Sequence, residues 1–365
     1  MSEILQKYAA LLTRYCLELK KGERLYIQST TAAEDLVREV YREACRIGAH
    51  TEISLSIREQ NRIFLGREDD SLLEYISPAY QYAVENFEAF LIIRAPYNLK
   101  EDFNTDAAKA GRRQHHLKSV QQTFFRRTAD KSMRRCVCQF PTLAAAQEAD
   151  MSLEEYQHFV YNACHLYAED PVSEWIKVRS RQQHIVDLLN QSDQIRYVSS
   201  ATDISFSVKG RTWINSDGRA NMPSGEVFTG PIENSLNGHI HFDYPSVYMG
   251  NEVQGITLWV RDGQVYKWKA EKGEKFLDTI FNIEGARYFG EVAIGTNYNI
   301  QKATKNILFD EKIGGTVHMA IGQSYLQTGG KNVSPIHWDM ISDMKSGGEI
   351  WVDGSLIYRN GQFLI

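Results

Sequence analysis

The stretch RLYIQSTTAAEDLVREVYREACRIGAHTEISLS, residues 24–56, decides the fold of the first half of the chain. Residues 24–29 and 50–56 are typical of strands, and the residues between them have the spacing of a helix. Thr30 or Thr31 can cap this helix, and Gly48 can end it. A helix between two strands indicates a βαβ unit, whose strands run parallel.

The same pattern continues toward residue 195. The segments FEAFLIIRA (87–95) and CVCQFP (136–141) are short apolar runs, typical of strands buried on both faces of a sheet. Residues 142–193 are mostly helical, and Ser152 followed by Glu155 forms the signature of a capping box. We therefore predict an α/β N-terminal domain with a mainly parallel sheet in residues 1–195.

The pattern changes in residues 196–365, where short strands and glycine turns dominate. The pairs Asp262-Gly263 and Asn360-Gly361 are signals for tight hairpins between antiparallel strands. We predict that residues 196–365 form a second domain of α+β class with mainly antiparallel sheets.

Charge and composition exclude several functions. The 365 residues include 41 Lys and Arg against 46 Asp and Glu, a formal charge of −5, which argues against nucleic acid as a partner. The basic run 112–135 is better interpreted as a solvated helix face or a subunit interface than as a phosphate patch. No stretch is apolar enough to span a membrane, and the N-terminus lacks the apolar core of a signal peptide. The five cysteines are scattered and odd in number, which predicts a protein of the reducing cytoplasm.

The second domain carries residues suited to a metal hydrolase, which needs three to five carboxylate and imidazole ligands. His337 and Asp339 stand two apart in SPIHWDM (334–340), so a strand would place both on one face. Alone, each such residue is more often a solvated carboxylate or a hydrogen-bonded core histidine. The candidates are Glu226 in NMPSGEVFTGP, Glu291 in ARYFGEVAIG, and Glu311, His318 and Tyr325 in LFDEKIGGTVHMAIGQSY, together with His337 and Asp339.

A competing cluster is His239-Ile-His241-Phe-Asp243, whose three polar side chains would share one strand face and could hold zinc or copper. Spacing alone does not decide between this cluster and the first. The chain has no G-x-S-x-G elbow, no phosphate-binding P-loop, no G-x-G-x-x-G after a strand and no H-E-x-x-H. These absences remove serine-hydrolase, P-loop and zincin functions and weaken a dinucleotide one.

Taken together, the motifs resemble the aminopeptidase T family, the M29 metallopeptidases. Residues 139–175 are similar to the family's Pro-Thr, Ala-Gln and Met-Ser-Leu-Glu-Glu stretch, which ends in Glu-Asp-Pro. The segments NMPSGEVFTGP, EGARYFGEVAIG, LFDE, HMAIGQSY and IHWDM then follow in the family's order. Five ordered motifs make this resemblance far more specific than any single motif.

The resemblance implies a cytoplasmic, usually dimeric exopeptidase with two divalent metal ions in its C-terminal catalytic domain, acting on peptide substrates. Such a mixed set of carboxylates and imidazoles suits zinc, cobalt or manganese. The resemblance also argues against His239 and His241 as ligands. The implied site consists of the metal ligands Glu226, Glu291, Glu311, His318, His337 and Asp339 and the catalytic residue Tyr325.

The predicted function is a metal-dependent aminopeptidase that removes N-terminal residues from peptides through a binuclear metal centre. A binuclear amidase acting on a small non-peptide amide, and a non-catalytic protein on the same fold, remain alternatives. Ser224 stands where the family usually has Asp, the spacing from Glu311 to His318 is longer, and the loop from His318 to His337 is shorter. These departures concern the substrate cavity, so they bear on specificity more than on chemistry.

Overall fold

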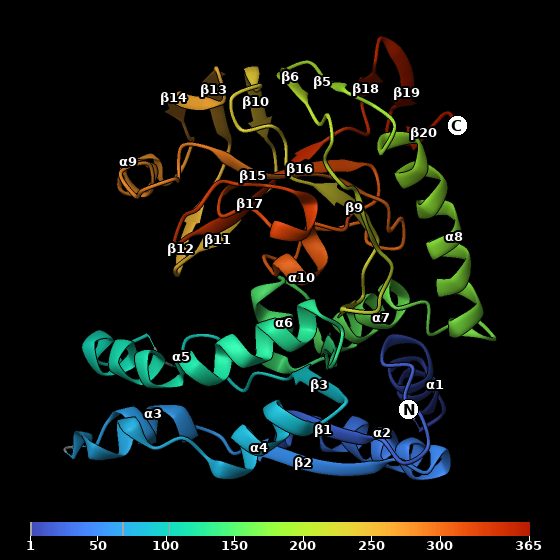
Figure 1. The fold of residues 1–365 in the computed structure, drawn as a ribbon, viewed down its shortest axis with the longest axis vertical. Helices are drawn as coiled ribbons and strands as arrows, with labels where there is room; N and C mark the ends of the chain where they lie inside the picture. The colour runs from blue at the N-terminus through green and yellow to red at the C-terminus, as the bar shows by residue number, and fades with distance from the viewer. Residues whose placement is uncertain (1, 68, 102) are drawn as a thin grey trace. The chain divides into compact units, whose positions relative to one another are not determined.

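A computed structural model describes residues 2–67, 69–101 and 103–365 (Figure 1). The chain divides into two compact units. The first comprises Met1–Glu174 with Gly218–Pro223, and the second comprises Trp175–Asp217 with Ser224–Ile365. The domain boundary expected between residues 195 and 196 falls inside β5 (Gln194–Val198), a strand of the second unit.

The first unit is built on a parallel sheet with the strand order β2-β1-β3-β4-β8. Leu91 in its middle pairs with Ile27 on one side and with Cys136 on the other, and all three are fully buried. A strand enclosed on both faces needs such an apolar sequence. The strands are β1 (Arg24–Thr30), β2 (His50–Ser56), β3 (Ala89–Arg94), β4 (Arg134–Gln139) and β8 (Asn221–Met222).

Helices connect these strands, and their ends follow the local signals in the sequence. Thr30 accepts a hydrogen bond from the Ala32 backbone nitrogen, and Gly48 ends a helix at φ 85°. The predicted capping box of Ser152 and Glu155 is formed. The helices are α1 (Ser2–Ala10) with a π-helical continuation (Leu11–Cys16), α2 (Glu34–Ile47), α3 (Gln60–Leu65), α4 (Pro78–Asn86), α5 (Ala107–Ala129), α6 (Leu143–Glu148) and α7 (Leu153–Ala163). The next helix, α8 (Pro171–Leu189), belongs to the second unit from Trp175 onward.

The second unit contains antiparallel sheets. Within the described residues, one has the order β14-β13-β10-β6-β5-β18-β19-β20, a second has the order β17-β16-β15-β9-β7, and β11 and β12 form a separate pair. The larger sheet comprises β14 (Gln264–Lys269), β13 (Ile256–Arg261), β10 (Asn237–Phe242), β6 (Asp203–Ser207), β5, β18 (Glu349–Val352), β19 (Ser355–Arg359) and β20 (Gln362–Phe363). The other strands are β17 (His337–Asp343), β16 (Thr316–Gly322), β15 (Phe289–Gly295), β9 (Glu226–Thr229), β7 (Ile214–Ser216), β11 (Ser246–Tyr248) and β12 (Asn251–Val253), and the short helices are α9 (Glu274–Ile280), α10 (Ile307–Asp310) and the 3₁₀ turn Leu326–Thr328.

The predicted fold class is therefore confirmed: a parallel α/β sheet comes first, and antiparallel sheets follow. Both expected hairpins form, and Asp262-Gly263 and Asn360-Gly361 adopt the positive φ angles that such tight turns need. In the described part of the chain, every helix is too short or too polar to cross a membrane.

The core of the second unit joins its two large sheets. Val292, Met319 and Trp338 on one face of the smaller sheet belong to the same buried apolar cluster as Ile240 and Leu258 of the larger sheet. Because side chains alternate along a strand, the residues between these apolar positions point to the opposite face of the smaller sheet. That face carries the candidate site.

Candidate metal centre

Strand register brings the predicted ligands together on one face of the smaller sheet. Glu291 on β15 lies opposite Ala320 on β16, and Ala320 lies opposite Asp339 on β17. His318 stands two residues before Ala320, and His337 stands two residues before Asp339, so both histidines share this face. Directly opposed residues in antiparallel strands have Cβ atoms about 5 Å apart, which places their side chains within reach of one another.

Small residues keep space open between the predicted ligands. Ala293 pairs with His318, Gly295 with Glu226, and Gly322 with His337. These pairs and Ala320 alternate with the apolar residues that face the core. The carboxylates and imidazoles of the site therefore surround a group of small residues on the sheet.

The trio Gly-Glu-Val occurs at residues 225–227 and again at residues 290–292, and the glycine of each trio has a steric explanation. A Cβ on Gly225 would lie 2.7 Å from the Cβ of Asn297, and φ there is +116°. A Cβ on Gly290 would lie 2.3 Å from the Gln323 carbonyl oxygen. Each glycine therefore permits a close backbone approach immediately before a site glutamate.

Glu291, His337 and Asp339, called here the Glu291 group, form one cluster whose ligand atoms all lie within 4.8 Å of one another. The Nε2 atom of His337 is 3.4 Å from Glu291 Oε2 and 3.5 Å from Asp339 Oδ1. Its Nδ1 lies 2.8 Å from the backbone carbonyl of Gln323. A carbonyl can only accept, so Nδ1 carries a proton, and Nε2 is the nitrogen that faces the two carboxylates.

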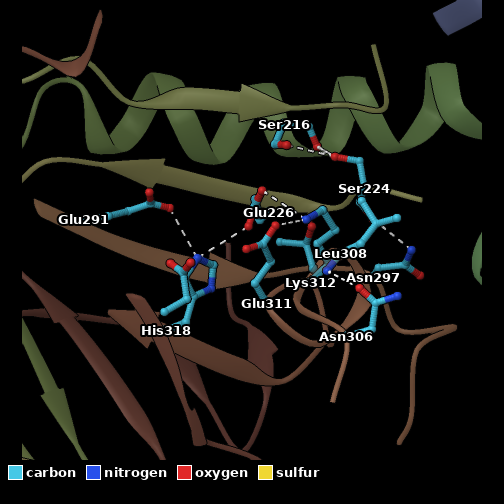
Figure 2. A network of polar contacts seen from close by, with 12 residues as sticks. Ser216, Ser224, Glu226, Glu291, Asn297, Asn306, Leu308, Glu311, Lys312 and His318 are labelled. Carbon is cyan, nitrogen blue, oxygen red and sulfur yellow. Dashed lines mark hydrogen bonds and ion pairs between the residues drawn. The ribbon is translucent and has the colours of Figure 1, made fainter. Parts of the chain in front are cut away.

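Glu226, Glu311 and His318, called here the Glu226 group, form a second such cluster. Figure 2 shows His318 between Glu226 and Glu291, and its Nε2 lies 3.5 Å from Glu226 Oε2. Glu311 follows α10, whose first turn is capped by the side chain of Asn306. A helix end thus supplies the third member of a group that otherwise comes from strands.

Glu291 connects the two groups. Its Oε1 lies 3.3 Å from His318 Nε2, while its Oε2 lies 3.4 Å from His337 Nε2. One carboxylate therefore presents an oxygen to each group, the arrangement that a bridging ligand of two adjacent metal ions needs.

Tyr325 stands at the rim of the Glu291 group. Its ring centroid lies 5.0 Å from the His337 ring and 5.7 Å from the Phe228 ring, and the residue is 44% exposed. Partial burial, followed by the charges of Glu291 and Asp339, raises the pKa of its phenol well above the usual value. Tyr325 is thus a protonated donor that both solvent and the site can reach.

The site is strongly coupled electrostatically. Burial raises the pKa of Glu311 to about 8, although Lys312 opposes the shift. Burial lowers the pKa of His318, but the contacts with Glu291 and Glu226 outweigh it and raise the pKa to about 9. For Asp339, burial is outweighed by His337, which lowers the pKa of the carboxyl. These shifts follow from four carboxylates gathered in a buried space.

The donor set fits a divalent cation. Glu226 Oε2 and Asp339 Oδ1 are buried and have no hydrogen-bond partner within the described part of the chain. Buried carboxylate oxygens without a donor are costly unless a cation neutralises them. Each group offers two carboxylates and one imidazole, a set that suits several divalent metals.

Two residues of the site were not anticipated from the sequence. Lys312 is fully buried, contacts Glu311, and lies 3.7 Å from Glu226 Oε1. Gln182 of α8 is 1% exposed and donates to the backbone oxygen of Glu226 and to the Asn215 side chain, which fixes the start of β9. What marks both residues is that they are polar and buried. Burial cannot be seen in a sequence, so neither residue had a signal there.

The competing cluster brings His241 Nε2 to 3.8 Å from Asp243 Oδ1, but within the described residues it does not form a group of three possible ligands. His241 Nδ1 is 2.9 Å from Thr257 Oγ1, and Asp243 accepts a hydrogen bond from the Asp343 backbone nitrogen. Among the described residues, the groups able to hold a metal ion are the Glu226 and Glu291 groups, and His239, His241 and Asp243 belong to neither. Ser224, the departure noted above, is fully buried and bonds to Ser216 through its hydroxyl, 2.8 Å away (Figure 2).

Known proteins share this sequence pattern and this fold. The family described as thermophilic metalloprotease (M29) matches residues 1–363. Aminopeptidase PepS of Streptococcus thermophilus is 27% identical over 419 residues, which cover 100% of this chain and 98% of that protein. Aminopeptidase 2 of Geobacillus stearothermophilus is 27% identical over 350 residues, covering 88% of this chain and 84% of that protein. The solved structure of wild-type AmpT from Thermus thermophilus has the same fold, with a TM-score of 0.85 at 22% identity over 99% of each chain.

Proposed function

We propose a function on the premise that this chain belongs to the M29 family of metalloproteases and is a metalloaminopeptidase. The proposed function is the removal of N-terminal residues from peptides at a binuclear metal centre. The observation that carries the proposal is Glu291, whose two oxygens face His318 and His337. A carboxylate shared in this way fits between two metal ions. The proposed ligands are the Glu226 and Glu291 groups.

Two bound divalent ions would supply a water of lowered pKa and would polarise the scissile carbonyl. The chain's own residues complete the chemistry. Tyr325 keeps its proton and can donate a hydrogen bond to the oxyanion that develops on the carbonyl oxygen. This donor needs no rearrangement of the strands, because it stands beside the His337 ring.

Glu311 is the carboxylate best suited to carry a proton. Its side chain is 16% exposed, against 6% for Glu226, so it is the more accessible of the two carboxylates that pair with Lys312. We propose that it takes the proton from the attacking water and passes it to the amine nitrogen of the leaving peptide. Glu226, which shares Lys312 with Glu311, is the second candidate for this role.

The free amino terminus of the peptide would explain removal of a single residue. As a neutral amine, it could bind one of the two divalent ions through its nitrogen. A peptide bond further along the chain would lack such an amine near the site. The free amine therefore positions the first peptide bond.

The test is hydrolysis of leucyl anilide and of its N-acetylated form by protein freed of metal and then reloaded with zinc, cobalt or manganese. We expect hydrolysis of the free-amine substrate after reloading and negligible hydrolysis of the acetylated one. Equal cleavage of both would favour an amidase without N-terminal recognition. Metal binding without hydrolysis of either substrate would favour a non-catalytic protein.

We also propose that the chain works as a homodimer in the cytoplasm, as the family resemblance implies. Light scattering of the purified protein tests the dimer. A mass of one chain, 41.8 kDa, would contradict it, and twice that mass would support it.

A further inference from the structure

The Glu226 group contains a built-in cation. Lys312 is fully buried, and its Nζ contacts Glu311 Oε1 and lies 3.7 Å from Glu226 Oε1. A buried ammonium group is costly unless opposite charges surround it. Glu226 and Glu311 supply that charge. Figure 2 shows Lys312 beside these two carboxylates, which are also proposed ligands of a metal ion.

The two groups are otherwise chemically matched. Each consists of two carboxylates and one imidazole, with ligand atoms within 4.8 Å of one another. In the described chain, the ion pairs of Glu291 and Asp339 are with histidines, whereas those of Glu226 and Glu311 include Lys312. Lys312 is thus the main difference in charge between the groups.

We propose that Lys312 makes the Glu226 group the weaker of the two metal sites, so that the Glu291 group fills first and the second ion is the exchangeable one. This inference rests on the proposed binuclear function. Glu226 directs Oε1 to the ammonium group and Oε2 to His318. Metal can therefore bind through Oε2 without expelling the lysine, but it must then share a buried space with a fixed positive charge.

Coulomb repulsion sets the size of the effect. Charges a few ångströms apart interact strongly in a buried site, even with the screening that real proteins provide. The repulsion acts on the ion in the Glu226 group most, because Lys312 contacts both of its carboxylates. A separation of at least about tenfold between the two dissociation constants follows.

The experiment is a titration of the metal-free, full-length protein with Mn²⁺, in which the electron paramagnetic resonance signal reports free Mn²⁺. Wild type should show two Kd values at least about tenfold apart. Lys312→Met should tighten the weaker site by at least about tenfold and leave the tighter Kd nearly unchanged. Lys272→Met is the matched control, because Lys272 also pairs with a glutamate, Glu252, outside the site, and it should change neither Kd.

Two further variants test the order of filling even if Lys312→Met does not fold. Glu226→Gln should remove the weaker site and keep the tighter one, and Asp339→Asn should do the reverse. Loss of the tighter site in Glu226→Gln would overturn the inference. So would weaker Mn²⁺ binding in a folded Lys312→Met, which would show that the lysine only orients its carboxylates.

Failure of this inference is separable from failure of the proposed function. Two ions bound with equal affinity, or in the opposite order, would overturn the role of Lys312 and leave the binuclear centre intact. Absence of Mn²⁺ binding by wild type would contradict both.

Discussion

At the scale of single residues, His337 and His241 should respond differently to substitution. His337 faces Glu291 and Asp339, whereas His241 bonds to Thr257. We expect His337→Ala to abolish anilide hydrolysis and to lower the metal content, because it removes the imidazole of the Glu291 group. His241→Ala should do neither. Metal content and anilide hydrolysis, measured in parallel on both variants, test this prediction. Loss of metal from His241→Ala would show that the metal binds at the His239–Asp243 cluster instead.

Tyr325 separates chemistry from binding. Its hydroxyl is assigned to an oxyanion that exists only along the reaction path, so Tyr325→Phe should lower kcat by about 10²–10³. KM and metal content should stay close to wild type, because the ring remains packed against His337 and Phe228. Steady-state kinetics on leucyl anilide at saturating metal measures this. A kcat within a few-fold of wild type would show that the tyrosine is structural.

The sequence led to the candidate ligands but not to the lysine beside them. His337 and Asp339 stand two apart in a strand-like segment, and that spacing alone places them on one face. Lys312 gave no comparable signal, because lysine is usually exposed. Its burial beside an opposite charge depends on Glu226, which lies on β9, far away in the sequence. A charge pair of this kind is visible only once the chain is folded.

At the scale of elements, the two faces of β16 have separate tasks. Ala320 lies between Glu291 and Asp339, whereas Met319 belongs to the core. Ala320→Val should weaken metal binding by about 10- to 100-fold, because its added methyl groups displace the ligands on either side. Met319→Ala should instead cost about 2–5 kcal/mol of stability and leave metal binding by the folded protein unchanged.

Metal titration and urea unfolding of both variants test this division. Equal effects of the two substitutions on metal affinity would contradict the division of the strand into a site face and a core face.

In the first sheet, Arg24 at the start of β1 holds Glu88 just before β3. Its guanidinium donates to both carboxylate oxygens, which lowers the pKa of Glu88 to about 2. Because the folded pKa lies below the unfolded value of 4.5, the pair stabilises the fold above pH 4.5 and loses this effect as the pH falls toward 2. Glu88→Gln should therefore cost about 1 kcal/mol at pH 7 and almost nothing near pH 2.

Hydrogen exchange of the β1 and β3 amides measures this difference in the first unit. All six tryptophans lie in the second unit, so tryptophan fluorescence serves as the internal control and should not change with Glu88→Gln. A cost that stays constant from pH 7 to pH 2 would show that the effect is not electrostatic.

Local sequence signals predicted individual helices and turns, but they did not predict which distant strands pair with one another. The capping box at Ser152 and the hairpin turns at Asp262-Gly263 and Asn360-Gly361 depend on a few neighbouring residues, so the sequence contains them in full. The order β17-β16-β15-β9-β7 depends on pairings between distant segments, which no local pattern specifies. The sequence therefore could not predict that the Glu226 and Glu291 groups lie next to each other, and only the folded structure shows it.

At the scale of the whole molecule, the change from helix-rich to strand-rich sequence indicated two parts, and the fold class followed from it. The return of residues 218–223 to the first unit had no sequence signal. The strand in this segment, β8, is two residues long, and it pairs with β4 through Val137 and Cys138. So short a strand is stabilised by its surroundings rather than by its own composition.

The central claim is that one chain holds two divalent ions at the Glu226 and Glu291 groups and uses both for hydrolysis. The most direct test is equilibrium dialysis of the metal-free protein against saturating Zn²⁺, with bound metal counted per chain and leucyl anilide hydrolysis measured on the same samples. The account predicts about two ions per chain and a rate that reaches its full value only when both are bound. Full activity at one ion or fewer per chain, or no bound metal at saturation, would contradict it.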